Sequence, residues 1–148
     1  MKTYIFNTNL FENKKISRKI EVAENISLYQ LAKAIVKAYD FNFDHCFGFF
    51  SKVSPYGYFG SEEQYELFTD LIEEGEEIEP TGAGSVKKTK VNEVWRKLKD
   101  RMMFLFDYGD NWRFLVELVD FGKKDAKKKY PRIIKKIGRA PKQYPKCQ

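Results

Sequence analysis

The sequence is poor in cysteine and histidine and has no long hydrophobic run. Its 148 residues contain two cysteines and one histidine, which excludes a disulfide framework and disfavours the usual zinc-ligand spacings. No run of 18 apolar residues is present, so we expect no transmembrane helix and no membrane partner. No apolar stretch follows the first lysine, so we expect no signal peptide and a cytoplasmic location.

Aromatic residues, in contrast, are plentiful. The chain has 13 Phe, 9 Tyr and 2 Trp, and 43% of its residues are hydrophobic. This content is enough to bury a core, which excludes wholesale disorder. The length is typical of one domain, and we expect a single domain over residues 1–148.

Two stretches of the chain are strongly biased toward charge of one sign. Residues 61–80 hold nine acids and no base, whereas residues 121–148 hold eleven bases and one acid. The net charge of +6 therefore averages a mildly acidic body and a basic last fifth. Two interpretations of the basic segment stay open: it lies on the acidic residues 62–79, or residues 123–139 bind nucleic acid. The candidate phosphate contacts are Lys127, Lys128, Lys129, Arg132, Lys135, Lys136 and Arg139.

Hydrophobic periodicity predicts an α+β fold. Alternation in residues 4–10 and 16–22 predicts a β-hairpin. A capping box of Ser27 and Gln30 then predicts a helix. We expect a mostly antiparallel sheet of about five strands, covered by two to four helices, with the hairpin and helix at the N-terminus.

The middle of the chain gives weaker patterns. Residues 44–52 are apolar on both faces and predict a central strand. A second capping box, Ser61 with Gln64, predicts a helix over about 62–74. Residues 75–90 are rich in Gly, Glu, Thr and Lys, which predicts a mobile loop.

The remaining patterns lie between residue 91 and the C-terminus. A short helix is expected at 91–98, and strands are expected at 103–106 and 112–119. The isoleucines of residues 133–137 indicate one packed turn of helix or strand.

The segment between the last two strands carries the most informative motif. In Phe106–Trp112, Asp107 and Asp110 flank a glycine that permits positive φ. One interpretation is a hairpin turn in which Asp and Asn side chains bond nearby amides. The other is a carboxylate pair that holds a divalent cation or serves as acid and base.

The one histidine, His45, does not complete a catalytic set. Cys46 is its neighbour in the chain, but adjacent strand residues point to opposite faces, which disfavours a Cys–His dyad. We therefore expect a structural role for His45 and assign no catalytic residue.

Four blocks of the sequence resemble the plasmid pRiA4b ORF-three-like family, whose members include passenger proteins of mobile elements. The first, the predicted strand–strand–helix opening, is generic, and the other three are more specific. These three are DHCFGF at 44–49, FDYGDNW at 106–112 and YPRIIKKIGRAPKQYP at 130–145. The sequence departs from many relatives at Phe114, where they carry a histidine, and at residues 141–143, where they carry Pro-Glu-Asp. A metal or acid–base role that depends on those groups is therefore weakened. The resemblance implies a shared fold and a conspicuous surface, and the family has no established activity. The residues that would form this surface are His45, Asp107, Tyr108, Gly109, Asp110 and Trp112, with Tyr130 and Pro131 nearby.

Three hypotheses for function follow. The preferred one is a non-catalytic binding or accessory module of a mobile-element-associated family, with a protein or nucleic-acid partner and no cofactor. The second is a metal-dependent hydrolase or nuclease that uses Asp107 and Asp110 as ligands of a divalent metal. The third is a nucleic-acid-binding protein that acts through residues 123–139.

Overall fold

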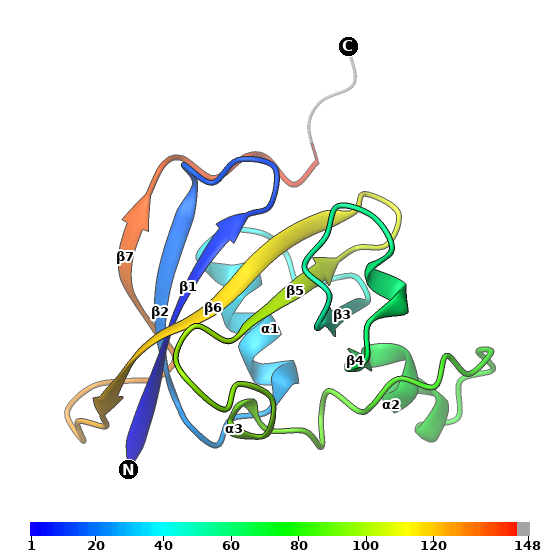
Figure 1. Cartoon of the computed structure of the whole chain (residues 1–148), viewed down its shortest axis with the longest axis horizontal. Helices are drawn as coiled ribbons and strands as arrows, with labels where there is room; N and C mark the ends of the chain where they lie inside the picture. The colour runs from blue at the N-terminus through cyan, green and yellow to red at the C-terminus, as the bar shows by residue number, and fades with distance from the viewer. Residues whose placement is uncertain (145–148) are drawn as a thin grey trace.

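Seven antiparallel strands form one sheet in the computed structural model, which describes residues 1–144 (Figure 1). Their order across the sheet is β4-β3-β5-β6-β1-β2-β7. The α+β class and the antiparallel sheet are confirmed, whereas the expected number of about five strands is wrong. The strands are β1 (Lys2–Leu10), β2 (Ser17–Ala23), β3 (Phe47–Phe50), β4 (Gln64–Glu66), β5 (Arg101–Phe106), β6 (Trp112–Lys123) and β7 (Arg132–Ile137).

Three α-helices and one 3-10 turn accompany the sheet. The helices are α1 (Leu28–Ala38), α2 (Leu67–Glu73) and α3 (Val91–Val94), and the turn η1 spans Tyr58–Gly60. The N-terminal hairpin and helix are confirmed. Helix α1 begins after Ser27 because the Ser27 hydroxyl accepts from Gln30 N–H and the Gln30 side chain accepts from Ser27 N–H. No helix within residues 1–144 is long and apolar enough to cross a membrane.

Helix α1 covers one face of the sheet and forms the main core with it (Figure 1). Aromatic rings fill this layer: Phe6 packs edge-on against Trp95 at 4.8 Å between centroids, and Phe49 stacks on Phe104 at the same distance. A smaller cluster of Phe50, Met103 and their neighbours lies on the opposite face. Strand β3 is therefore apolar on both faces, and its two neighbours in the sheet confirm that it is not an edge strand.

The prediction of a helix over residues 62–74 is wrong in its first part. Residues Gln64–Glu66 pair with β3 as the short edge strand β4, and α2 begins only at Leu67. The Ser61 hydroxyl donates to the Tyr58 carbonyl instead of capping a helix. The acidic Ser-x-x-Gln pattern is typical of a helix start, but pairing with β3 overrides this local preference.

The basic segment does not lie on the acidic residues 62–79, so that interpretation is wrong. It forms β7, which pairs with β2 at the edge of the sheet opposite β4 (Figure 1). Arg132 there forms an ion pair with Glu21 at 2.7 Å. Residues 145–148 of the predicted segment lie outside the described residues.

The loop predicted over residues 75–90 has no helix or strand, but its second half is tied to the fold. Gly84 exchanges two backbone hydrogen bonds with Gln64 and Glu66 of β4. The buried Asp70 carboxylate accepts from the Ser85 hydroxyl and from Val86 N–H. Mobility is therefore expected only of the exposed residues before Ala83.

A buried cation, Arg18, joins three elements. Its side chain donates to Ala38 O at the end of α1, to Ser17 O on β2, and to Ile137 O and Gly138 O at the end of β7. Arg18 is 3% exposed, and no carboxylate pairs with it among residues 1–144. Four backbone carbonyls, one of them at the negative end of a helix dipole, stabilise the charge instead.

We expect Arg18→Lys to destabilise the protein by about 3 kcal/mol, because one ammonium cannot reach the carbonyls that the planar guanidinium joins. Urea unfolding followed by circular dichroism measures this loss. The control is Lys19→Met, one residue further on β2, which should shift stability by less than about 0.5 kcal/mol. Equal losses in the two variants would contradict the role given to Arg18.

A buried phenol makes stability depend on alkaline pH. Tyr39 is fully buried and bonds the Thr8 hydroxyl at 3.0 Å, and burial raises the pKa of Tyr39 from 10.0 to about 12. The unfolded chain ionises this phenol near pH 10, so its stabilising contribution is complete below pH 10 and is lost between pH 10 and 12. Tyr39→Phe should reduce the fall in stability across this range by up to about 1.4 kcal/mol per pH unit. Urea unfolding at a series of pH values checks this, and an unchanged slope would contradict it.

Candidate functional site

Asp107 braces the turn between β5 and β6. Its φ of 67° is in the left-handed region, and its Oδ1 accepts from the N–H groups of Gly109 and Asp110 at 3.1 and 3.2 Å. Its own N–H donates to Cys46 O, and its carbonyl accepts from Asn111 N–H. Asp107 is 6% exposed, whereas Asp110 is exposed to solvent. The structure therefore places the two carboxylates in different environments, and Asp107 makes the contacts of the hairpin-turn interpretation.

Tyr108 is held by a buried carboxylate. Its hydroxyl donates to Glu66 of β4, a residue that is 3% exposed. Burial, followed by the hydrogen bond to Glu66, raises the pKa of the Tyr108 phenol far above its usual value. A Cβ on Gly48 would lie 2.9 Å from the Tyr108 hydroxyl oxygen, so only glycine leaves room for this pair.

Trp112 lies at the start of β6 and packs on the core. The centroid of its ring is 4.8 Å from the centroid of the Phe41 ring. The side chain of the adjacent Asn111 accepts a hydrogen bond from the Tyr58 hydroxyl. The Trp112 indole N–H is buried and has no hydrogen-bond partner within residues 1–144. The motif is thus mostly engaged with the fold, and its exposed tip comprises Gly109, Asp110 and Asn111.

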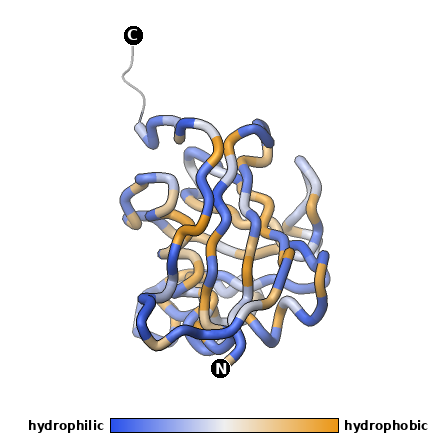
Figure 2. Tube along the Cα trace, turned by 90° about the vertical axis from the view of Figure 1, so that its left-hand side faces the viewer, coloured by the Kyte–Doolittle hydropathy of each residue, from blue (hydrophilic) through white to orange (hydrophobic). Residues whose placement is uncertain are grey.

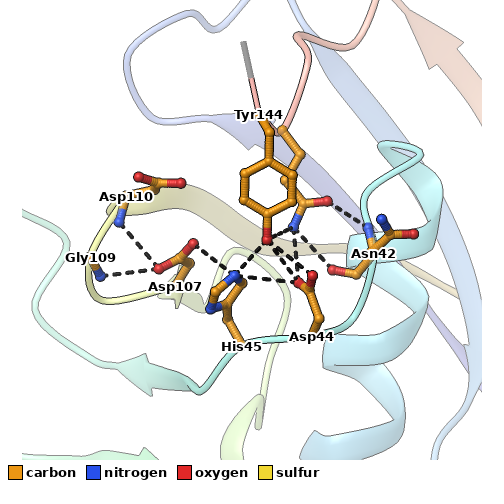
Figure 3. Close-up of polar contacts among 8 residues, drawn as sticks. Asn42, Asp44, His45, Asp107, Gly109, Asp110 and Tyr144 are labelled. Carbon is orange, nitrogen blue, oxygen red and sulfur yellow. Dashed lines mark hydrogen bonds and ion pairs between the residues drawn. The ribbon is translucent and has the colours of Figure 1, made fainter. Parts of the chain in front are cut away.

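His45 lies beside this turn in a cluster with Asp44, Asp107 and Tyr144 (Figure 3). Its Nε2 is 2.5 Å from the Tyr144 hydroxyl, 3.3 Å from Asp107 Oδ2 and 3.6 Å from Asp44 Oδ1. The Tyr144 hydroxyl also bonds Asp44. Partial desolvation and the hydrogen bond to Asp44 raise the pKa of Tyr144 to about 12.

Gln143 and Tyr144 form a strap that lies over the segment after α1 and reaches this cluster. The Gln143 side chain accepts from Asn42 N–H and donates to Asn42 O, as a neighbouring strand would do. The same amide also donates to Asp44. Gln143 is 8% exposed, and its three contacts fix Tyr144 over His45.

The cluster lacks the geometry of a proton relay. In a Ser–His–Asp system, the nucleophile and the orienting carboxylate contact opposite ring nitrogens of the histidine, whereas Asp44, Asp107 and Tyr144 all approach Nε2 of His45. The Tyr144 phenol stays protonated at neutral pH, and burial raises the pKa of Cys46, which disfavours a reactive thiolate. Among residues 1–144, no group of three or more His, Cys, Asp or Glu side chains is arranged to hold a metal ion.

Tyr130 and Pro131 do not join this cluster. They precede β7, whose first residue pairs with Glu21. The last residue of β7 pairs with Ser17, which lies next to the turn between β1 and β2. That turn and the Asp107 turn lie at the same end of the sheet, because Leu10 pairs with Phe114 near the start of β6. Tyr130 and Pro131 are therefore at the other end of β7.

The residues assigned to nucleic-acid contact lie on one turn and one strand. Lys127, Lys128 and Lys129 are exposed in the turn before β7, and Lys135, Lys136 and Arg139 are exposed on β7 or just after it. Arg132 is half-buried in its ion pair with Glu21. Figure 2 faces this edge of the sheet, where hydrophilic and hydrophobic segments alternate along the front strands.

A groove of about 460 Å³ runs between α1 and β7. Its charged lining residues are Lys33 and Lys37 from α1 and Arg132 from β7, and it has no acidic lining residue. The other lining side chains are mostly apolar: Ile20, Tyr29, Gln30, Ala34, Pro131 and Ile133. An apolar floor with a basic rim suits an anionic ligand that also carries apolar groups.

Sequence reasoning missed several of the residues that build these surfaces. Asp44 and Tyr144 complete the His45 cluster, and Gln143 positions it. Lys33 and Lys37 lie on the exposed face of α1, but nothing in the sequence indicated that β7 would lie beside them. The only available signal for Gln143 and Tyr144 was their place inside the last motif block.

Comparisons with known proteins agree with this fold. The family model for plasmid pRiA4b ORF-3-like protein matches residues 4–143. The chain is similar to the crystal structure of a protein of unknown function, MM3350, from Methanosarcina mazei Go1, with a TM-score of 0.73 and 23% sequence identity. That match covers 95% of this chain and 71% of the other. At this identity it shows the fold alone. Among curated proteins, none matches this chain.

If Asp107 acts as a brace, its variants should differ in stability in a defined order. Asp107→Ala should lose about 2 kcal/mol, because it removes two hydrogen bonds and leaves a left-handed residue without a local acceptor. Asp107→Asn keeps an acceptor oxygen and tolerates this conformation, so it should lose less than about 1 kcal/mol. Asp110→Asn, the matched control on the exposed side of the turn, should be neutral. Urea unfolding measures the series, and equal losses for all three would refute the brace.

Proposed function

The chain belongs to the plasmid pRiA4b ORF-3-like protein family, and we propose that it is a non-catalytic binding module that holds an anionic partner in the groove between α1 and β7. The observation that carries this proposal is the groove itself, whose charged lining residues are all basic and whose floor is apolar. The family description names a plasmid, and an accessory role in mobile elements is part of the same proposal.

The Asp107 turn and the His45 cluster are assigned a supporting role in this proposal. Both Asp107 carboxylate oxygens have contacts within the chain, with backbone N–H groups on one side and His45 on the other. A carboxylate in these contacts would have to give them up to bind a metal or a substrate. The groove, in contrast, presents Lys33 and Lys37 to solvent with no ion-pair partner within residues 1–144.

The basic residues of β7 support the groove as the binding surface. Lys135 and Lys136 are exposed on the strand that forms one wall, so the positive charge of the helix and of the strand adds along one edge. Such a concentration of one sign attracts an oppositely charged partner and speeds its association, most strongly at low ionic strength.

The test measures binding of two labelled anionic probes, an acidic decapeptide and a single-stranded DNA 20-mer, by fluorescence anisotropy at 50 mM salt. We expect the wild-type chain to bind at least one probe and the double variant Lys33→Glu/Lys37→Glu to weaken that binding by about tenfold or more. The matched control, Lys14→Glu/Lys15→Glu, makes the same charge change on the exposed β1–β2 turn and should have little effect. Absence of binding to both probes, or equal losses in the two variants, would refute the groove as the binding surface.

A further inference from the structure

We infer that the partner of the groove is an extended acidic segment of another protein, which adds to β7 as an eighth strand beside α1. This inference rests on the proposed function and specifies its partner. It combines three observations: an open sheet edge, exposed apolar side chains along that edge, and a basic rim.

The two edges of the sheet differ in whether another segment of the chain covers them. At the β4 edge, Gly84 exchanges backbone hydrogen bonds with Gln64 and Glu66, so the chain covers that edge itself. At the opposite edge, β7 pairs only with β2, and no segment of residues 1–144 lies along its outer side as a strand. An uncovered edge of six residues presents the unpaired N–H and C=O groups that a peptide strand can use.

Apolar side chains follow the open edge. Ile133, Ile134 and Ile137 are 38%, 36% and 47% exposed, although they belong to a strand of the sheet. Ile133 also lines the groove next to α1. A strand laid along β7 would remove such side chains from water, which is favourable in proportion to the apolar area covered.

The charges on this edge determine which strand it can accept. Lys135 and Lys136 on β7 and Lys33 and Lys37 on α1 attract glutamate or aspartate side chains. The same lysines repel a second copy of β7, because pairing of two copies would bring like charges together. The edge is thus open to an acidic strand and protected from self-pairing.

An extended peptide fits these observations better than a nucleic acid. Nucleic acids are held by phosphate contacts and by stacking of bases on aromatic rings. The one aromatic side chain that lines the groove is Tyr29, whose ring packs against Phe43 and has Lys87 Nζ 5.1 Å from its centre. The isoleucines and the open backbone edge can contact the side chains and the backbone of a peptide, but they provide no specific contact to phosphate groups.

The probe for this inference is an acetylated heptapeptide in which glutamates alternate with valines, added to the unmodified full chain. Two further peptides carry N-methyl groups, one on its glutamates and the other on its valines. Because alternate N–H groups of a strand point to the same side, a strand bound in one direction presents only one of these sets to β7. We expect one methylated peptide to bind at least about tenfold more weakly and the other to bind like the parent. Amide hydrogen exchange should slow at β7 when the parent peptide binds.

The outcomes separate this inference from the proposed function. If Lys33→Glu/Lys37→Glu weakens binding but neither methylated peptide does, and β7 amides are not protected, strand addition is refuted while the anionic groove stands. If the DNA 20-mer binds more tightly than the peptide through the same lysines, the partner class is refuted. Sedimentation measures whether the chain alone self-associates at low salt. If it does, and Lys33→Glu/Lys37→Glu abolishes the self-association, the occupant is a second copy and the inference is again refuted. If no anionic probe binds, the proposed function itself fails.

Discussion

The Arg18 guanidinium is the contact on which the arrangement of both candidate surfaces depends. It is buried, no carboxylate of residues 1–144 pairs with it, and it is stabilised by carbonyls that belong to the ends of α1, β2 and β7. These carbonyls are far apart in sequence, so the charge holds them together only when all three elements are in place. Arg18 therefore connects the end of α1 to the end of β7, the two elements that flank the groove.

The basic last part of the chain serves both surfaces. Its first half forms β7 and one wall of the groove. After Gly138 the chain continues to the segment that follows α1. There the Gln143 side chain bonds the Asn42 backbone as a neighbouring strand would, and the Tyr144 hydroxyl contacts His45. The high positive charge of this segment therefore belongs to a folded edge and strap, whereas the acidic residues 62–79 contain β4, which forms the opposite edge of the sheet.

Local patterns in the sequence predicted the elements whose stability is local. The Ser27–Gln30 capping box, the alternation of the first hairpin and the Asp-Tyr-Gly-Asp turn all act within a few residues, and they occur where they were expected. The strands β4 and β7 have no such signature: β4 was predicted as part of a helix, and residues 133–137 were left open between a turn of helix and a strand. Strand β4 is three residues long within an acidic stretch, and β7 leaves its isoleucines exposed, so neither shows the alternation of a half-buried strand. The partners of His45 could not be predicted, because Tyr144 reaches it through a strap 99 residues away in sequence.

The open edge at β7 also has a consequence for colloidal behaviour. Its isoleucines and unpaired backbone would favour chain-to-chain contact, and the lysines beside them oppose it by repulsion that acts over about 10 Å at 0.1 M salt but only about 3 Å at 1 M. Solubility should therefore decline as ionic strength rises, contrary to ordinary salting-in. Any counter-ion that neutralises these lysines without covering the strand would promote precipitation.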